Sequence, residues 1–444
     1  MSVGVTTLAN GIRVVTEAMP HLETVALGVW VGVGSRHETR AENGISHLLE
    51  HMAFKGTQRR SSHEIAAAIE NVGGDINAST SLEQTAYYAR VLRGDTALAL
   101  DVLADILRNS VFEPDELVRE KDVIEQEIAA ALDTADDLVF DTAQALAFDG
   151  HSAGRSILGT PETLAAFDAE QLRRFLAEKY APGRIVISAA GAIEHAEFAG
   201  QVEALFGDMP ARDLAEDTLS PAEFVGGTRY ETRQIEQTHL ILGWPAPPLG
   251  DPAYYSAHVL SGVLGGGMSS RLFQRAREER GLCYSIYAYC WSLVDAGLFG
   301  VYAATSGEHV AGLHALIRSE LAELAGEGPG DEELMRAKAQ LKSGLLMGLE
   351  SPSVRADQMA RHLLCYGRVL TQRDLIETIN AVSREDVRAV AGTIACGDRR
   401  LWSEVGPERD TGAILATHAH GTRTRGGTAP VGRGGKQTVA ALRQ

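Results

Sequence analysis

The sequence predicts an α+β protein made of two homologous domains that arose by internal duplication. Short segments recur in the same order and at nearly the same separation: Ile45–His51 ("ISHLLEH") resembles Leu260–Gly266 ("LSGVLGG"), and Asp115–Ile128 resembles Glu332–Leu345. Each half also combines a strand-like segment with a segment of helical periodicity. One duplicated α+β unit therefore accounts for the pattern in both halves.

The expected elements begin with two short strands at the N-terminus. "VTTL" and "IRVV" flank Asn10-Gly11, a dipeptide typical of a hairpin turn. Thr85–Leu92 is rich in β-branched and aromatic residues, which predicts a strand, and "TALALDVLADILRNSV" after it has helical spacing of apolar residues. In the second half, Gly297–Thr305 and "HVAGLHALIRSELAEL" predict the same strand and helix.

Changes in composition indicate the domain boundaries. We predict an N-terminal domain over residues 1–205 and a C-terminal domain over 227–405. Residues 206–226 between them are acidic, contain prolines and lack sustained periodicity, which predicts a linker. Residues 406–444 are rich in glycine and threonine and nearly lack large apolar residues, which predicts a disordered tail.

Composition also excludes several classes of function. A net charge of −18 argues against nucleic acid as a partner, and fits either a cationic substrate or solubility alone. No apolar run is long enough to span a membrane, and no signal or transit peptide is evident. The four cysteines include no C-x-x-C pair, which indicates reduced thiols rather than a disulfide framework. We therefore expect a cytoplasmic protein.

The segment His47-Leu48-Leu49-Glu50-His51 is a candidate metal site. On a helix, His47 and His51 project from one face, as two ligands of one ion must. Glu50 lies between them and can reach a water molecule on the metal without being a ligand, as a general base should. H-x-x-E-H is the inverzincin signature. The alternative, a helix that merely carries two surface histidines, stays open on these five residues alone.

A catalytic zinc site needs a third protein ligand, and "VREKDVIEQEIAAAL" supplies glutamates. Glu120 and Glu127 are seven residues apart and share a helix face, whereas Glu125 is turned away from it. We assign Glu127 as the third ligand. Glu120 is expected to orient a histidine or the ligand cluster from behind, and Glu125 to be solvated.

The second half provides an internal control, because it lacks every proposed residue of the metal chemistry. In the order His47, Glu50, His51, Glu120 and Glu127, the counterparts are Gly262, Gly265, Gly266, Ala337 and Gly344. A purely structural histidine helix gives no reason for the distant glutamate to vary together with the histidines. The joint loss therefore supports one metal site in the first half and none in the second.

Taken together, His47, Glu50, His51 and Glu127 resemble the pitrilysin family of zinc peptidases (M16), most closely the β-type subunit of mitochondrial processing peptidase and its bacterial homologues. "GGDINASTSLEQTAYYARVL" and "LGGGMSSRLFQRAREERGLCYSI" also resemble blocks of that family. The resemblance covers about residues 3–405. It implies that each half is a mostly antiparallel sheet with helices packed on one side, and that the halves enclose a central cavity. It also implies pairing with an identical copy or a related M16 chain.

The resemblance implies further site residues in both halves. Arg277 and Tyr284 match an arginine and a tyrosine that reach the scissile peptide from the second half, where the tyrosine hydroxyl can donate to an oxyanion. Asn77 and Ala78 match the edge strand that pairs with the backbone of an extended peptide substrate. An ordinary edge strand is the alternative for that segment.

An acidic pair, Asp137 and Asp141, matches the residues of the processing subunit that bind the substrate arginine two residues before the cut. They lie at i and i+4, so one helix face carries both carboxylates. The family typically has glutamate at the first position, so Asp137 is a shorter substitute. A solvated acidic face is the alternative.

We therefore predict a metalloendopeptidase with one Zn²⁺ per chain that hydrolyses short or unfolded basic peptides, with a preference for arginine two residues before the cut. Two alternatives remain. One is a general peptide-degrading M16 peptidase. The other is a non-catalytic core or scaffold subunit, although such subunits tend to lose the motif residues that this chain keeps.

Overall fold

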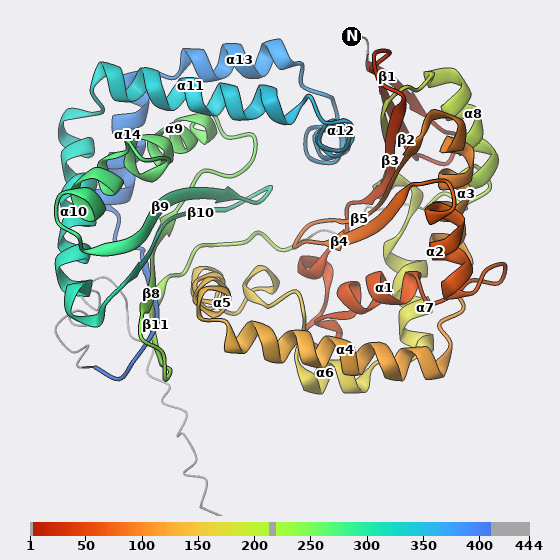
Figure 1. Cartoon of the computed structure of the whole chain (residues 1–444), viewed down its shortest axis with the longest axis horizontal. Helices are drawn as coiled ribbons and strands as arrows, with labels where there is room; N and C mark the ends of the chain where they lie inside the picture. Colours follow the sequence, from red (N-terminus) through yellow and green to blue (C-terminus); the bar gives the residue numbers. More distant parts are fainter. Residues whose placement is uncertain (1–2, 213–218, 410–444) are drawn as a thin grey trace, which may run out of the picture.

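The computed structural model describes residues 3–212 and 219–409, which form two sheets, one from each half of the chain (Figure 1). The first sheet has six strands in the order β1-β2-β6-β3-β5-β4. In chain order these are β1 (Val3–Thr7), β2 (Arg13–Ala18), β3 (Thr24–Val31), β4 (Asp75–Thr80), β5 (Thr85–Leu92) and β6 (Ile185–Gly191). The second sheet has five strands in the order β7-β11-β8-β10-β9. These are β7 (Gly227–Thr232), β8 (Thr238–Pro245), β9 (Cys283–Ser292), β10 (Gly297–Thr305) and β11 (Leu401–Gly406).

The two sheets correspond strand by strand once β1 is set aside. The series β2-β6-β3-β5-β4 of the first half matches β7-β11-β8-β10-β9 of the second. Each series contains one parallel pair, β2 with β6 and β11 with β7, and the remaining pairs are antiparallel. The predicted α+β fold with two related, mostly antiparallel sheets is confirmed. β5 and β10 have the bounds predicted from the sequence.

Fourteen α-helices are assigned within the described residues, eight in the first half and six in the second, and most of them follow the same duplication. The first half contains α1 (Ile45–Ala53), α2 (Ser62–Glu70), α3 (Thr96–Arg108), α4 (Pro114–Asp133), α5 (Ala135–Ala147), α6 (Pro161–Ala166), α7 (Ala169–Lys179) and α8 (His195–Phe206). The second contains α9 (Tyr254–Gly265), α10 (Val310–Glu327), α11 (Asp331–Gly348), α12 (Pro352–Tyr366), α13 (Gln372–Ala381) and α14 (Arg384–Cys396).

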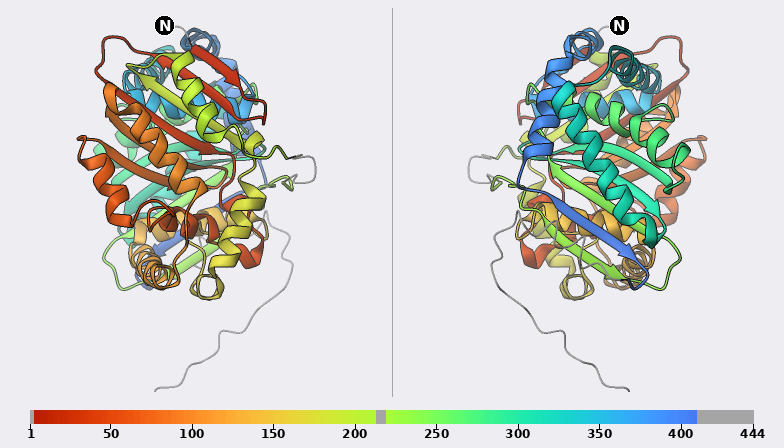
Figure 2. Two further views of the ribbon diagram at one scale, coloured as in Figure 1. Left: turned by 90° about the vertical axis from the view of Figure 1, so that its right-hand side faces the viewer. Right: turned by 90° about the vertical axis from the view of Figure 1, so that its left-hand side faces the viewer.

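Each half packs its own helices on one side of its sheet, as expected from the sequence. In the first half, alternate residues of β3, namely Val25, Leu27, Val29 and Val31, join side chains of α1, α2, α3, α7 and α8 in one buried core. In the second half, β8 and β10 pack in the same way against α9, α10 and α14. Figure 2 shows these helices over the outer faces of the two sheets.

The other face of each sheet is covered by a helix from the opposite half, which the sequence prediction did not include. Helix α12 of the second half lies on β2, β3 and β6, and α5 of the first half lies on β7, β8 and β11 (Figure 1). The two contacts repeat one another in detail. The Ser188 hydroxyl donates to the carbonyl of Ala356 in α12, and the Ser403 hydroxyl donates to the carbonyl of Val139 in α5, at 2.8 and 2.9 Å.

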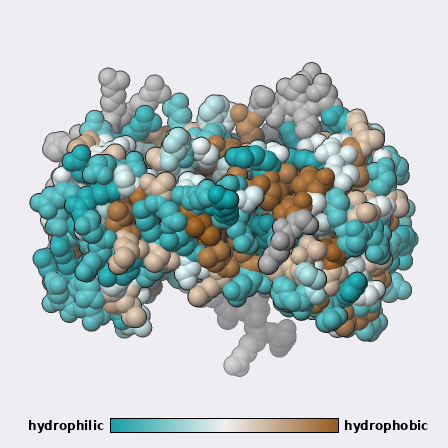
Figure 3. Space-filling model, turned by 90° about the horizontal axis from the view of Figure 1, so that it is seen from above, coloured by the Kyte–Doolittle hydropathy of each residue, from teal (hydrophilic) through white to brown (hydrophobic). Residues whose placement is uncertain are grey.

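The contact of α12 with the first sheet is both apolar and polar. Met359 and Leu363 are buried against Val15 and Trp30. The Trp30 indole also donates to the Asp357 carboxylate at 2.9 Å. Seen from above, hydrophobic residues gather over the middle of the molecule, where the halves meet, and the outer parts are mostly hydrophilic (Figure 3). The exchanged helices thus extend the hydrophobic core across the junction.

Parts of the predicted linker and tail lie outside the described residues. These are 213–218 of the linker 206–226, and 410–444 of the tail 406–444. Of the predicted tail, Gly406 belongs to β11, and Arg409 pairs with the buried Glu404. Among the helices of residues 3–212 and 219–409, none is long and apolar enough to cross a membrane.

Candidate metal centre

Helix α1 presents His47, Glu50 and His51 on one side and buries the other. Its apolar residues are packed in the core of the first half: Ile45, Leu48, Leu49, Met52 and Ala53. The three motif side chains are half-buried. The two imidazole rings lie edge to face with their centroids 4.6 Å apart. The predicted helical geometry of the motif is therefore present.

A buried carboxylate fixes the start of this helix. Gly44, the residue before α1, has a φ of +95°, and a side chain there would collide with Gly159, whose Cα would lie 2.8 Å away. Gly44 has no side chain to cap the helix, and Glu38 takes that role. Its carboxylate accepts from the backbone N–H groups of Gly44 and Ser46, each at 2.9 Å. Burial raises the pKa of Glu38 to about 7.

Helix α4 brings Glu127 to the two histidines. A Glu127 carboxylate oxygen lies 3.7 Å from Nε2 of His47 and 3.7 Å from Nε2 of His51. One ligand atom of each of the three residues lies within 4.8 Å of the others, which is the arrangement that a single metal ion requires. The residues that the sequence analysis selected from segments far apart in the chain thus meet at one point.

Glu120 stands behind His51, as predicted. Its carboxylate lies 3.0 Å from Nδ1 of His51, so Nε2 of that ring is the nitrogen turned toward Glu127. The other carboxylate oxygen of Glu120 lies 2.6 Å from the ammonium of Lys55. A histidine backed by a carboxylate in this way is held in one orientation with Nε2 available as a ligand.

The environment of His47 favours its neutral form. Burial, with a smaller contribution from neighbouring His51, lowers the pKa of His47 to about 4. Its Nδ1 is buried, and no hydrogen-bond partner for it lies among residues 3–212 and 219–409. Neutral imidazole is the form that binds metals. Two imidazoles and one carboxylate, with Glu120 behind one imidazole, are a donor set that fits a catalytic Zn²⁺ with one open position.

Glu50 lies beside the ligands and is held by the first sheet. The Thr80 hydroxyl, at the end of β4, donates to the Glu50 carboxylate at 2.5 Å. Burial raises the pKa of Glu50 above its ordinary value, and the hydrogen bond from Thr80 opposes part of this rise. A carboxylate with a raised pKa, fixed next to a metal cluster, has the properties of a general base.

Arg277 and Tyr284 form a separate group on the second half. Arg277 lies in a π-helical turn, Phe273–Glu278, and Tyr284 near the start of β9. The Arg277 guanidinium lies 4.7 Å from the ring centroid of Phe273 and 5.3 Å from that of Tyr284. The Tyr284 side chain is largely exposed, at 70%. The pair is therefore preassembled, with the phenol accessible to a bound molecule.

The predicted acidic pair is divided between two environments. Asp137 and its neighbour Asp136 line a cavity of about 420 Å³ between α5 and the second half. Arg277 and several aromatic side chains complete the cavity: Phe140, Phe273, Tyr287 and Tyr302. Asp141 does not line this cavity. Its side chain is exposed, and its pKa is raised because partial desolvation and the nearby Asp137 carboxylate outweigh a hydrogen bond with the Ser156 side chain.

Asn77 and Ala78 lie on β4, which is the outermost strand of the first sheet. Both residues pair with β5 on one side only. The Asn77 side-chain oxygen accepts from the backbone N–H of Ala78 at 2.8 Å. The strand predicted to receive substrate is thus an edge strand, with the amide of Asn77 covering one of its backbone donors.

The counterpart of the metal centre in the second half is closed. Gly262, the counterpart of His47, is so near α11 that a Cβ on it would lie 3.2 Å from the Cβ of Ala337, the counterpart of Glu120. The space left there is a cavity of only about 10 Å³. The glycines that replace the motif therefore serve close packing, with Gly262 against α11 and Gly265 against Ala288 of β9.

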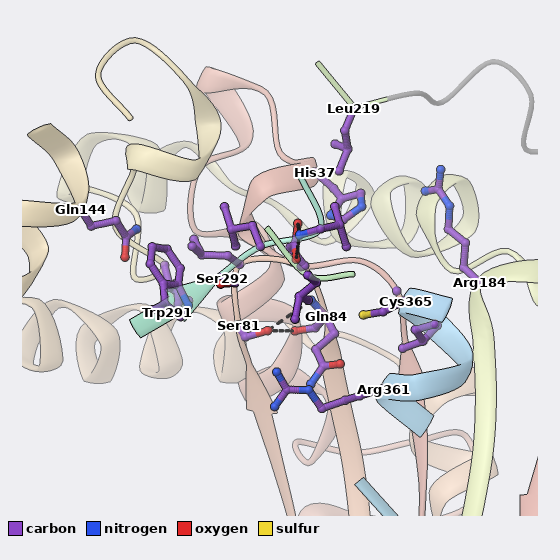
Figure 4. A pocket seen from close by; sticks show the side chains of 18 of the residues that line it. His37, Ser81, Gln84, Gln144, Arg184, Leu219, Trp291, Ser292, Arg361 and Cys365 are labelled. Atoms are coloured by element: carbon purple, nitrogen blue, oxygen red, sulfur yellow. Dashed lines mark hydrogen bonds between the residues drawn. The ribbon is translucent and has the colours of Figure 1, made fainter. Parts of the chain in front are cut away.

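A larger cavity, of about 490 Å³, lies at the junction between the halves rather than at the metal centre. Figure 4 shows Ser81 and Gln84 from the turn after β4, Trp291 from β9, and Arg361 and Cys365 from α12 around it. Both halves line this cavity and the 420 Å³ cavity, and neither is lined by the candidate metal ligands His47, His51 and Glu127. The metal centre lies instead on the facing sides of α1 and α4.

The fold and the site together define two copies of one unit, of which the first carries a candidate metal centre and the second does not. Comparison with known proteins agrees. Residues 13–161 match the family model described as insulinase (peptidase family M16), and residues 166–341 match the model described as peptidase M16 inactive domain.

Relatives of similar length are known in several bacteria. The chain is 42% identical over 395 residues to the uncharacterized zinc protease YmxG of Bacillus subtilis, covering 89% of this chain and 96% of the relative. It is 40% identical to an uncharacterized zinc protease of Streptomyces coelicolor, covering 91% and 90%. The chain therefore belongs to peptidase family M16.

Solved structures share the fold. A protease from Helicobacter pylori superposes with a TM-score of 0.85 at 20% identity, over 91% of this chain and 99% of that one. A structure described as peptidase M16 inactive domain from Pseudomonas fluorescens gives 0.84 at 22%, over 92% and 99%. At this identity the likeness shows the fold alone.

Sequence reasoning missed three residues at the metal centre, Glu38, Lys55 and Thr80, and it missed Asp136 in the 420 Å³ cavity. Lys55 lies one helical turn after His51, and that spacing is a signal that could have been used. Asp136 is adjacent to a selected residue. The contacts of Glu38 and Thr80 depend on the tertiary fold, and no local sequence pattern predicts them.

Proposed function

We propose that this chain is a zinc-dependent endopeptidase that cleaves short or unfolded, basic peptides. The observation that carries the proposal is the convergence of His47, His51 and Glu127 on one point, with Glu50 beside them. One Zn²⁺ per chain would be held by these three ligands. Zinc in such a site supplies Lewis-acid chemistry that lowers the pKa of a bound water.

The side chains of the first half perform the proton transfer. Glu50 accepts the proton of the attacking water and then delivers it to the leaving amine, as a general base and acid. The pKa of Glu50 is raised, so it lies closer to neutral pH than the pKa of an exposed carboxylate does. Thr80 holds the carboxylate in place throughout.

The substrate is held by both halves. An extended peptide adds to the free edge of β4 at Asn77 and Ala78, where main-chain hydrogen bonds give affinity with little dependence on sequence. Tyr284 donates to the developing oxyanion, and Arg277 stacks on its ring and orients it. The second half contributes these two groups without a metal site of its own.

Preference for basic peptides is supported by the 420 Å³ cavity. Asp136 and Asp137 offer two carboxylates there, and aromatic faces line the rest, a combination that attracts a guanidinium by charge and by cation–π contact. This favours a processing-type peptidase that selects arginine two residues before the cut. Because Asp141 lies apart from this cavity, a general peptide-degrading peptidase with weak arginine preference is the second candidate.

We further propose that the active form is a dimer, with an identical copy or with a related M16 chain. Comparison of the purified mass in solution with the 47.5 kDa of one chain tests this directly. Peptidase activity measured on the same fractions shows which assembly is active.

The test of the function separates metal binding from chemistry. Glu50→Gln should retain zinc and abolish cleavage of an unfolded peptide, whereas Glu127→Gln should lose zinc as well. Full cleavage by Glu50→Gln would overturn the mechanism. A zinc-loaded parent chain that cleaves neither a presequence-like basic peptide nor a neutral unfolded one would instead indicate the non-catalytic scaffold. Equal cleavage of both peptides would indicate the general degrading enzyme.

A further inference from the structure

Two homologous turns meet at the junction of the halves. The turn at residues 81–84 joins β4 to β5, and the turn at 293–296 joins β9 to β10. Each is closed by the same backbone hydrogen bond, from the first residue to the carbonyl of the last, at 2.8 Å in both cases. Glu83 and Asp295 occupy the third position of their turns. The two carboxylates are therefore counterparts in the duplication.

The segments that support these turns also correspond, and only one of them carries a cation. Ser35 donates its backbone N–H to the carbonyl of the first residue of turn 81–84, at 3.1 Å. Leu249 does the same for turn 293–296, at 2.8 Å. Aligned on these bonds, Arg36 in the first half corresponds to Gly250 in the second. As in the metal centre, the functional side chain is kept in the first copy alone.

Arg36 binds both carboxylates at once. Its side chain is completely buried, and its guanidinium lies 2.5 Å from Glu83 and 2.5 Å from Asp295. Each carboxylate also accepts a hydrogen bond from a backbone N–H group. Glu83 accepts from the backbone N–H of Val294 in the opposite turn, at 3.2 Å, and Asp295 accepts from that of Ala222, at 3.0 Å. One cation thus serves two carboxylates related by the duplication.

The first-half partners of this cluster lead directly to the catalytic residues. Arg36 lies in a short helical turn, Ser35–His37, and the next residue is Glu38, whose carboxylate caps the helix that carries Glu50. Turn 81–84 follows Thr80, which donates to Glu50. The second-half partner, Asp295, lies in the turn that joins β9 to β10, and Tyr284 lies on β9. A single ion cluster therefore connects the general base with the half that supplies the tyrosine.

We propose that Arg36 is a positioning residue that, through Glu83 and Asp295, holds the second half at a fixed placement against the helix and edge strand of the metal centre. The proposal rests on the proposed peptidase function. Binding of peptide to β4 uses the first half alone, whereas Tyr284 and Arg277 act from the second half. For a neutral unfolded peptide, which does not use the 420 Å³ cavity lined by both halves, loosening the cluster should therefore lower kcat and leave zinc content and KM almost unchanged.

The principal test removes the carboxylate of the second half. Asp295 is partly accessible, so Asp295→Ala should fold. Its kcat on an unfolded peptide should fall roughly 10- to 100-fold, the loss expected when catalytic groups are misplaced by about 1 Å. Asp295→Glu keeps the charge and should retain most of the parental kcat. If Asp295→Ala does not fold, Asp295→Asn removes the charge with less change in shape.

Glu333→Ala is the matched control. Glu333 also pairs with an almost buried arginine, Arg271, also accepts from a backbone N–H, and has similar exposure, but all of its contacts lie inside the second half. The Glu333→Ala substitution should leave kcat at the parental value. An equal loss of kcat in Glu333→Ala and Asp295→Ala would mean that general destabilisation is the cause, and would overturn the proposal.

The placement of the halves can be measured without any activity. Spin labels are attached at Val118→Cys on α4 and Met335→Cys on α11, both exposed, in a chain whose exposed Cys365 and Cys396 are replaced by serine. Asp295→Ala should shift or broaden the distance distribution, and Glu333→Ala should not. An unchanged distribution, or a changed one with parental kcat, overturns the positioning role. A parent chain that cleaves no peptide refutes the proposed function separately, because the distance measurement still reports on the cluster.

Discussion

His51 and Glu120 form a hydrogen-bonded pair across α1 and α4, with Nδ1 of the ring 3.0 Å from the carboxylate. The ammonium of Lys55, at 2.6 Å, holds the other oxygen of that carboxylate. The pair fixes the ring so that Nε2 points at the position between the three ligands. Metal affinity should therefore depend on Glu120 although it is not a ligand.

Glu120→Gln is expected to weaken zinc binding about 10- to 100-fold, the usual effect of removing a carboxylate behind a ligating histidine. Competition with a chelator of known affinity measures the change. The matched control is Glu125→Gln, on the same helix but exposed, which should bind zinc like the parent. Equal affinity in Glu120→Gln and the parent would show that the ring is held by its packing alone.

The hydrogen bond from Thr80 to Glu50 should control the pH dependence of cleavage. A general base must be ionised, so activity is present above its pKa and is lost as the pH falls through it. The bond lowers the pKa of Glu50, against the rise caused by burial. Thr80→Val should therefore raise that pKa and move the acid limb of the kcat/KM profile to higher pH. Thr80→Ser keeps the hydroxyl and should reproduce the parental profile; a limb that does not move in Thr80→Val would exclude this role.

Selection of arginine should depend on Asp137 more than on Asp141. Asp137 lines the 420 Å³ cavity, whereas Asp141 lies outside it and interacts with Ser156. Asp137→Asn should lower kcat/KM roughly 10-fold for a peptide with arginine before the cut, the value of one charge-assisted hydrogen bond, and leave a neutral peptide unaffected. Asp141→Asn should change the ratio of the two rates less. The opposite order would place the arginine site at Asp141.

The exchanged helices should make the two halves unfold together. Met359 of α12 is completely buried against the first sheet, so Met359→Ala should cost about 2–5 kcal/mol of stability. Urea titration followed by tryptophan fluorescence, which reports on Trp30 in the first half and on Trp244, Trp291 and Trp402 in the second, and by circular dichroism for the whole chain, should give one shared transition. Met335 is an exposed residue of α11, so Met335→Ala should change the free energy of unfolding by no more than about 0.5 kcal/mol. Two separate transitions would show that the halves are independent.

The candidate metal ligands were accessible to sequence reasoning because each depends on a local period and on comparison with the second copy. His47 and His51 follow from helical spacing, and Glu127 follows from its loss together with them in the second half. The bounds of β5 and β10 could also be predicted, because β-branched and aromatic residues are concentrated within each of these segments. Duplication turned one sequence into two observations of the same unit.

Contacts between distant segments could not be predicted in this way. The periodicity of α12 shows that it is a helix with an apolar face, but not that this face lies on the sheet of the other half. The same holds for Arg36, whose two carboxylates are far from it along the chain. The bond between Thr80 and Glu50 depends on where an edge strand passes a helix. Such contacts are properties of the folded arrangement rather than of any segment.

The exchange of α5 and α12 also limits how this protein could have been inherited. A gene that encoded only the first half would leave the face of its sheet around Val15 and Trp30 bare, because the helix that covers it is encoded in the other half. The inactive copy therefore could not be discarded once the metal centre was confined to the first. Conversely, a break in the chain between the halves need not separate them. The two fragments would still be held together, because α5 packs on the sheet of the second half and α12 on the sheet of the first.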